Sequence, residues 1–362
     1  NLDNQMENKR LNIGKKVVTF GEVMLRLSTP GFRRFSQTNE WIATYGGSEA
    51  NVAVSLAHFG VPTEFVTRLP DNAIAHACID SLRSYGLGTE GVVFGGKRMG
   101  IYFLEPGAAF RNSNVVYDRE DSAFATLRPG MIDWEKVFDG AGWFHWSGIA
   151  AALSQEGADA CREALEVADR MGLIISCDLN FRKKLWNYGR TAAEVMMPLV
   201  QYSDVLFGAE PEYREIMGVE PVGFKAVTAA DVSFETNLPA FETFMRKVSK
   251  AVPRCQKVFL ELRNSLTANH NLLAAVLLSD GKLHHTGIYD IEHEVDRVGA
   301  GDAFVGGMIY GLRAYPDDAQ KALDFALAAS ALKNTVYGDF NLVTVEEVES
   351  LMQGNTSGRV SR

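Results

Sequence analysis

The chain has 362 residues, of which 46% are hydrophobic and 22% charged, and this composition excludes a disordered, collagen-like or disulfide-scaffold protein. With 36 Lys and Arg against 45 Asp and Glu, the formal net charge of −9 disfavours non-specific binding to nucleic acid or to an anionic membrane. Any anionic ligand therefore needs a local cluster of basic side chains.

The first residues are polar and lack the apolar core of a secretory signal, and no apolar run approaches the roughly 18 residues of a membrane span. We therefore expect a cytoplasmic protein without a membrane or nucleic-acid partner. The four cysteines form no Cys-x-x-Cys pair, so neither a zinc site nor a disulfide framework is indicated. We expect one folded domain over residues 16–348, with residues 1–15 and 353–362 as flexible termini.

Short β-rich runs alternate with helical stretches along most of the chain. Helices are predicted at residues 48–59, which end before Gly60, and at residues 72–85, which end at Gly86. Such alternation indicates an α/β fold with a mostly parallel central sheet and helices on both faces. The strands are predicted at the apolar, β-branched runs 17–22, 63–68, 143–146, 173–180, 204–207 and 257–263.

Two segments interrupt this alternation. Residues 91–120 contain three successive strand-like runs, at 92–94, 99–104 and 115–117, and residues 29–45 repeat this on a smaller scale. We interpret both as parts of a small β-rich lid inserted into the α/β body. Further along, the strands 272–278 and 282–289 flank Asp280-Gly281, a dipeptide typical of a β-hairpin turn.

The sharpest local motif is Gly299-Ala300-Gly301-Asp302, at the start of an apolar helix. Unpaired backbone N–H groups and the helix dipole make such a helix start suitable for phosphate oxygens. Asp302 in the first turn is placed to accept a proton from a hydroxyl that attacks phosphorus. A glycine-rich turn in which Asp302 merely caps the helix is the alternative.

A second motif, Gly46-Gly47 followed by Ser48 and Asn51, precedes the first long helix. Glycines allow the backbone to approach a ligand closely, and the Asn51 amide offers donors and acceptors for sugar hydroxyls. The alternative is a loop in which Ser48 caps the helix.

Two near-matches to nucleotide motifs do not fit. Residues 91–98 almost spell a P-loop, but Arg98 stands where Ser or Thr is required and a strand follows. Gly299-x-Gly301-x-x-Phe304 lacks the third glycine of a dinucleotide fingerprint and lies far from an opening βαβ unit, so a dehydrogenase is a weak alternative.

Together, residues 46–60 and 296–304 resemble the two signatures of the ribokinase-like (PfkB) carbohydrate kinases. Residues 20–28, 100–105, 116–119 and 178–186 are similar to phrases found in the kinases of 2-keto-3-deoxygluconate within that family. The resemblance runs from about residue 17 to residue 352. It implies a ribokinase-like fold and the transfer of the γ-phosphoryl group of Mg-ATP to a sugar hydroxyl, here giving 2-keto-3-deoxy-6-phosphogluconate.

The resemblance also implies roles for individual residues. Asp302 would be the general base, and Gly299, Ala300 and Gly301 would cradle the transferred phosphoryl group. The substrate would be held by the following residues: Gly46, Gly47, Asn51, Tyr102, Tyr117, Arg119 and Arg182.

The arginines agree with an acidic substrate on independent grounds. A sugar acid carries a carboxylate, and Arg offers a permanently charged fork to bind it. Arg119 follows a lid strand and Arg182 a core strand, so closure of the lid could bring both to one substrate. For each, an exposed loop arginine is the alternative. Arg26 stands where many neutral-sugar members carry Asp, which suits an anion, although an exposed strand position explains it equally.

For the nucleotide, the resemblance implies ATP contacts by Arg263, Gly299, Gly301 and Asn334, with adenine near residues 328–334. Family members commonly have Asn-x-x-Glu near the metal, but this chain has Ala209 in place of the Asn and retains Glu212 as a residue that supports Mg²⁺ indirectly. A monovalent cation is left open, and a homodimer or larger assembly is expected from the lid edges. The alternatives are a kinase for fructose, ribose or a related keto acid, and a catalytically silent kinase-like protein.

Overall fold

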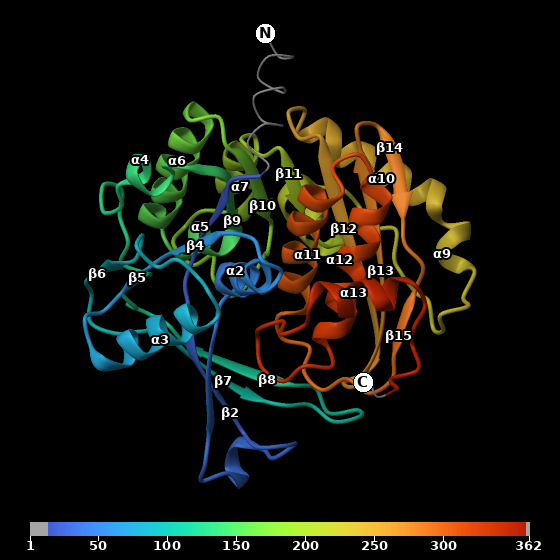
Figure 1. The fold of residues 1–362 in the computed structure, drawn as a ribbon, viewed down its shortest axis with the longest axis horizontal. Coiled ribbons are helices and arrows are strands. Elements are labelled where there is room, and N and C mark those ends of the chain that lie inside the picture. Colours follow the sequence, from blue (N-terminus) through green and yellow to red (C-terminus); the bar gives the residue numbers. More distant parts are fainter. Residues whose placement is uncertain (1–13, 360–362) are drawn as a thin grey trace.

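The computed structural model describes residues 14–359, which form an α/β body with a small second sheet at one side (Figure 1). Within these residues the main sheet has nine strands in the order β14-β13-β12-β11-β10-β9-β1-β4, with β15 also paired to β13. Six strands of this sheet, β1, β4, β9, β10, β11 and β12, are mutually parallel, whereas β13 runs antiparallel to β12, β14 and β15. The strands are β1 (Lys16–Phe20), β4 (Thr63–Val66), β9 (Ala141–Ser147), β10 (Ile174–Asp178), β11 (Val205–Phe207), β12 (Lys257–Thr267), β13 (His270–Ser279), β14 (Lys282–His285) and β15 (Tyr289–Ile291).

Helices cover both faces of this sheet, as the alternation of the sequence predicts. Successive residues of β1 show why: Val17 packs into a cluster with α2 (Ser48–His58), α11 (Ala300–Ala314) and α12 (Ala319–Lys333), whereas Val18 packs into the cluster on the opposite face. That second cluster includes α6 (Gln155–Arg170), α7 (Ala192–Val200) and α10 (Leu238–Ala251). The other helices are η1 (Phe35–Gln37), α3 (Ala73–Ser84), α4 (Trp134–Val137), α5 (Gly148–Leu153), α8 (Glu210–Met217), α9 (Ser233–Thr236) and α13 (Val345–Met352).

The predicted hairpin is confirmed between β13 and β14. Asp280 and Gly281 both adopt positive φ angles, 49° and 79°, which a two-residue type I′ turn requires. This antiparallel extension lengthens the sheet on the side where the predicted nucleotide residue Arg263 lies on β12.

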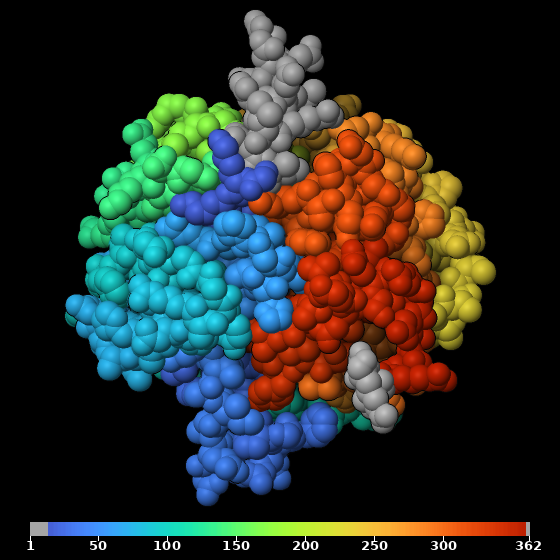
Figure 2. All heavy atoms as spheres, in the orientation of Figure 1, coloured from blue at the N-terminus to red at the C-terminus, as the bar shows by residue number. Residues whose placement is uncertain are grey.

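The second sheet has four strands in the order β3-β2-β7-β8. We call it the lid sheet. Its N-terminal part projects from the body as the blue lobe of Figure 2. Its strands are β2 (Met24–Ser28), β3 (Ile42–Gly46), β7 (Ile101–Glu105) and β8 (Asn114–Asp118). Two strands differ from expectation: β2 belongs to the lid sheet, whereas β6 (Val93–Phe94) pairs with β5 (Arg68–Leu69) outside it.

The remaining expectations concern the chain as a whole. In the part of the chain that the structure describes, every helix is too short or too polar to cross a membrane. All four cysteines are buried and unoxidised. The predicted flexible termini, residues 1–15 and 353–362, fall partly outside the described residues.

Candidate active site

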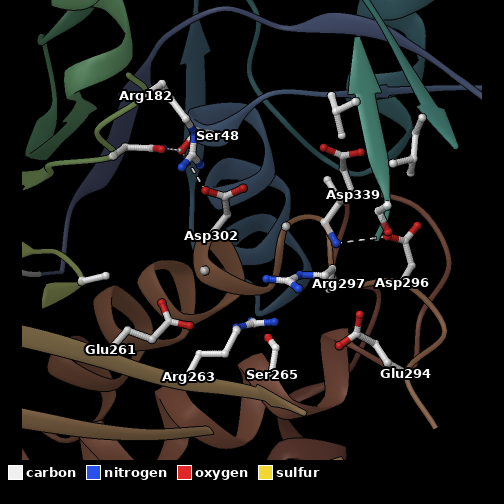
Figure 3. Close-up of a pocket in the computed structure, with 18 of the residues that line it drawn as sticks. Ser48, Arg182, Glu261, Arg263, Ser265, Glu294, Asp296, Arg297, Asp302 and Asp339 are labelled. Atoms are coloured by element: carbon white, nitrogen blue, oxygen red, sulfur yellow. Dashed lines mark hydrogen bonds between the residues drawn. The ribbon is translucent and has the colours of Figure 1, made fainter. Parts of the chain in front are cut away.

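A cleft of about 1270 Å³ opens between the lid sheet and the carboxyl ends of the parallel strands. Such an edge is where ligands bind in open α/β sheets. Figure 3 shows Asp302 in this cleft between Arg182 on one side and Glu261 with Arg263 on the other. The two sequence motifs, which lie about 250 residues apart, meet here, because Ser48 and Asn51 both contact Asp302.

The start of α11 has the geometry of an anion hole. Gly299 caps the helix with a φ of 85°, and a Cβ at this position would lie 2.1 Å from the carbonyl oxygen of Asp339, so only glycine fits. The amides of Gly301 and Asp302 donate no backbone hydrogen bond within residues 14–359, and both residues line the cleft. The predicted role of Ala300 is different: its amide donates to the carbonyl of Arg297, so it supports the turn rather than facing a ligand.

Two hydrogen bonds hold the side chain of Asp302 in place. Its Oδ1 accepts a hydrogen bond from the Ser48 hydroxyl at 2.7 Å and its Oδ2 one from the Asn51 amide at 2.8 Å. Burial raises the pKa of Asp302 above its ordinary value, while the two hydrogen bonds oppose that rise. The result is a fixed carboxylate that is more basic than a solvated aspartate, which suits a general base.

The glycine pair before α2 allows a close approach of the Glu22 backbone on one side and of the Asp339 side chain on the other. A Cβ on Gly47 would lie 2.0 Å from the carbonyl oxygen of Glu22, and one on Gly46 would lie 2.2 Å from the Asp339 carboxyl carbon. Asn51 turns its side chain toward both carboxylates, since its Nδ2 donates to Asp302 and, at 3.1 Å, to Asp339. Asn51 is thus a rigid part of the cleft wall.

Asp339 is a cleft residue that sequence reasoning missed. It lies in the loop after α12, is buried, and accepts hydrogen bonds from Asn51, from the Tyr102 hydroxyl and from Arg26. Its local sequence, Gly338-Asp339, indicates only a turn, so no signal in the sequence marked it.

Arg26 was expected either to bind an anionic substrate or to be an exposed strand residue, and the structure shows neither arrangement. It is neither an exposed strand residue nor a lining residue of the cleft, because its side chain is fully buried. Its guanidinium donates to Ser28 at 2.8 Å, to Asp339 at 3.0 Å and to Asp296 at 2.5 Å. Burial alone would lower the pKa of Arg26, but the surrounding anionic groups raise it above its ordinary value. Arg26 therefore organises two carboxylates instead of meeting an anion itself.

Arg119 directly follows β8 and lines the cleft, as predicted, but it is already paired. Its Nε and Nη2 donate to one carboxylate oxygen of Glu22, whose other oxygen accepts from Ser122. Its guanidinium also lies 5.7 Å from the centre of the Tyr117 ring, and that ring is 48% exposed in the cleft. Glu22 is a second residue whose role the sequence did not reveal.

Arg182 is different, because it is exposed in the cleft and its side chain makes no hydrogen bond or ion pair with any residue that the structure describes. It follows β10 in the chain and exerts its charge on Asp178, Glu212 and Asp302, lowering the pKa of each against the effect of burial. A free guanidinium next to Asp302 is available to a carboxylate or a phosphate.

Ala209, which stands where family members commonly have Asn, directly precedes α8. Without an Asn side chain, the first turn of α8 is closed by Glu212, whose carboxylate accepts from the amides of Ala209 at 2.9 Å and Phe181 at 3.1 Å. Burial raises the pKa of Glu212. Glu212 lines the cleft together with Asp178 and Glu261, so hard oxygen donors suited to a divalent cation are present.

The predicted nucleotide contacts divide into two groups. Arg263 lines the cleft on β12, and its buried Nη1 has no hydrogen-bond partner in the described chain. Burial and the nearby Arg297 lower the pKa of Arg263. By contrast, Asn334 is fully buried at the end of α12, where its amide donates to the carbonyl of Ser330 at 2.8 Å. Residues 328–334 are buried apart from the half-buried Leu332, and none of them lines the cleft, so the cleft does not reach the predicted position of the adenine ring.

A cleft that joins an anion hole, a fixed carboxylate and free guanidinium groups on this sheet defines a phosphotransferase site. The comparisons agree: the model of the pfkB family of carbohydrate kinases matches residues 14–234 and 273–344, so the chain belongs to that family. It is an ATP-dependent sugar kinase with a ribokinase-like fold.

The chain is similar to three kinases of known name. The crystal structure of 2-dehydro-3-deoxygluconokinase from Thermotoga maritima superposes with a TM-score of 0.86 at 42% identity, covering 94% of this chain and 99% of that one. The 2-dehydro-3-deoxygalactonokinase of Haloferax volcanii is 32% identical over 95% of this chain and 98% of its own length. Fructokinase-1 of Oryza sativa subsp. japonica is 26% identical over 93% of this chain and 97% of its own.

Proposed function

We propose that this kinase phosphorylates 2-keto-3-deoxygluconate at its terminal hydroxyl to give 2-keto-3-deoxy-6-phosphogluconate. The observation that carries this choice is Arg182, a guanidinium without a partner among residues 14–359 that stands beside Asp302 in the cleft. A substrate carboxylate would give this cation the bidentate partner it lacks, whereas a neutral ketose would leave it unpaired. The similarity to two kinases of 2-keto-3-deoxy sugar acids supports the same substrate class.

The proposed reaction is an in-line transfer in which Asp302 accepts the proton of the terminal hydroxyl as its oxygen attacks the γ-phosphorus of ATP. Ser48 and Asn51 keep the carboxylate oriented toward the cleft. The free amides of Gly301 and Asp302 stabilise the negative charge on the equatorial oxygens of the phosphoryl group. The proton ends on Asp302 and leaves to solvent after the sugar phosphate departs.

Arg263 is proposed to bind the phosphates of ATP, because it combines a buried, unpaired nitrogen with a position next to the anion hole (Figure 3). The base would then lie along the same arm of the cleft, which is lined by Ser265, Thr267, Ala268 and Asn269.

Mg²⁺ would neutralise charge on the β- and γ-phosphates of ATP when bound. Within the described residues, the cleft carboxylates do not bring three ligand atoms within 4.8 Å of one another. Phosphates and water would therefore supply most of the ligands, with Glu212 acting indirectly, as expected for a cation that keeps its hydration. A requirement for a monovalent cation remains a prediction, and titration of activity with K⁺ at constant ionic strength tests it.

The substrate assignment is tested by measuring ADP release with four sugars: 2-keto-3-deoxygluconate, its C4 epimer, fructose and ribose. We expect kcat/KM to be highest for the keto acids. Arg182→Gln should raise the KM for the keto acids at least tenfold, since a charge-assisted pair with a carboxylate is lost, and should leave the KM for fructose almost unchanged. A preference for fructose in the unsubstituted protein would overturn the proposal in favour of a neutral ketose.

A further inference from the structure

Lys333, the last residue of α12, buries a charge that the reaction described above does not use. Its side chain is fully buried, and its ammonium group donates to the carbonyl oxygens of Asp296 at 3.1 Å and Val336 at 2.9 Å. An ammonium in the interior is costly unless it is compensated. The position of this group therefore needs a physical reason.

The two carbonyls belong to the two loops that complete the cleft. Asp296 begins the loop that leads to Gly299 and the anion hole, and Val336 precedes Asp339 by three residues. Gly299 in turn packs directly against the Asp339 carbonyl. One ammonium thus ties together, from behind, the segments that supply the phosphate-binding amides and the buried carboxylate.

Most of the charged groups that act on Lys333 are carboxylates. Asp296, Asp339 and Glu294 attract its proton and Arg26 repels it. Arg26 binds Asp296 and Asp339, whereas Glu294 interacts with Arg263 and Arg297 on its other side. Without Lys333, the buried carboxylates of Asp296 and Asp339 would have Arg26 as their only paired cation within the described residues.

We propose that Lys333 is a positioning residue for phosphoryl transfer: its ammonium fixes the loop of residues 296–302 and neutralises the buried aspartates, so that the anion hole accepts a phosphoryl group. The proposal rests on the kinase activity of the family and on the anion hole, and it is independent of which sugar is phosphorylated. Burial lowers the pKa of Lys333 to about 8, with Asp296 and Asp339 opposing the shift, so the group is charged below that pH.

The first test replaces the charge and keeps most of the volume, using Lys333→Met with the preferred sugar and ATP. Lys321→Met on the same helix is the matched control, since Lys321 is exposed and lies over the ring of Tyr315. We expect kcat to fall at least tenfold in Lys333→Met, with a smaller change in the KM for the sugar, while Lys321→Met behaves as the parent protein. A folded Lys333→Met protein with kcat within twofold of the parent would overturn the proposal.

Chemical rescue separates charge from packing. Lys333→Ala should regain activity severalfold when ammonium or methylammonium chloride is added, and tetramethylammonium chloride at the same ionic strength should not restore it, because that ion is too large and donates no hydrogen bond. A folded Lys333→Ala protein on which both salts act alike would indicate a merely structural role and would overturn the proposal.

If Lys333→Met and Lys333→Ala fail to fold, the pH dependence of kcat tests the proposal. The kcat of the parent protein should fall as the pH rises through about 8. Lys333→Arg should stay active to higher pH, since arginine keeps its proton. The groups that face Lys333 are Asp296, Asp339, Glu294 and Arg26. A profile that lacks the alkaline limb, or the same limb in Lys333→Arg, would overturn the proposal.

Discussion

Burial raises the pKa of Asp302 and two hydrogen bonds lower it. Substitution of this residue is the most direct test of the proposed mechanism. Asp302→Asn keeps the size and the hydrogen bonds to Ser48 and Asn51 within reach but removes the base. We expect kcat to fall by about 10²- to 10⁴-fold with a smaller effect on substrate binding. Steady-state kinetics with a binding isotherm for the sugar acid measure the two effects separately. Retention of most of kcat would remove Asp302 from its role.

The pH dependence of the reaction follows from the same carboxylate. Burial raises the pKa of Asp302, so its proton-accepting form is lost as the pH falls through a value above that of a solvated aspartate, about 3.9. We expect kcat/KM to decline on the acid side at a correspondingly higher pH. A profile that stays flat down to about pH 4 in a protein that remains folded would contradict the shift.

Substitution of Arg26 is expected to change the stability of the fold instead of the affinity for substrate. Arg26→Met would leave Asp296 and Asp339 buried without their shared cation. Breaking one side of a buried ion pair typically costs about 3–5 kcal/mol, so the free energy of unfolding should fall by that order. Denaturant unfolding measures the loss, and Arg246→Met, at an exposed pair with Glu242, is the control expected to change it by less than about 1 kcal/mol.

At the scale of the element, the turn into α11 depends on a glycine for two separable reasons. Gly299 needs a positive φ, and it also needs the absence of a Cβ that would strike the Asp339 carbonyl. Gly218 at the end of α8 has a similar φ of 69° but open space around it. Comparing alanine at both positions therefore isolates the contact from the backbone strain.

Gly218→Ala should lower the free energy of unfolding by about 1–2 kcal/mol and leave kcat unchanged. Gly299→Ala should lower kcat strongly as well, because the amides of the anion hole have to move. Equal kcat values for the two folded variants would show that the loop tolerates the displacement.

The helices and strands of the body were largely predictable, and the contacts inside the cleft were only partly so. Val17 and Val18 show why the body was predictable: strand alternation and helix periodicity are local patterns, and each is visible within a few residues. The partners of Arg26 and Arg119 could not be predicted, because Asp339 and Glu22 are remote from them in sequence and belong to no motif. Asn334, predicted as an ATP contact, is buried and does not line the cleft, and helical spacing cannot distinguish a core position from a ligand contact.

At the scale of the whole molecule, the lid sheet ends in two unpaired edge strands, β3 and β8, within the described residues. Apolar side chains are exposed on or beside these edges, among them Trp41, Ile42 and Val116. Exposed edges with apolar side chains favour pairing with another chain. We therefore expect a homodimer or larger assembly that forms through the lid sheet.

Ile42→Lys should shift the assembly toward the monomer, because a charged residue on an edge strand opposes pairing. Light scattering during size-exclusion chromatography measures the mass. Val232→Lys is the matched control at an exposed apolar residue next to α9, remote in the chain from the lid strands. A parent protein that is monomeric at every concentration would rule the assembly out.

The bond from Arg26 to Asp339 also has a consequence for how the protein is made. These residues are separated by 313 positions, so Arg26 on β2 gains this partner only after a loop much further along the chain has been synthesised. Because chains are built from the N-terminal side, the lid strands and most of the sheet exist before Asp339 is added. A nascent or prematurely terminated polypeptide that lacks Asp339 therefore has an incomplete cleft, and we expect phosphoryl transfer only once synthesis has passed that loop.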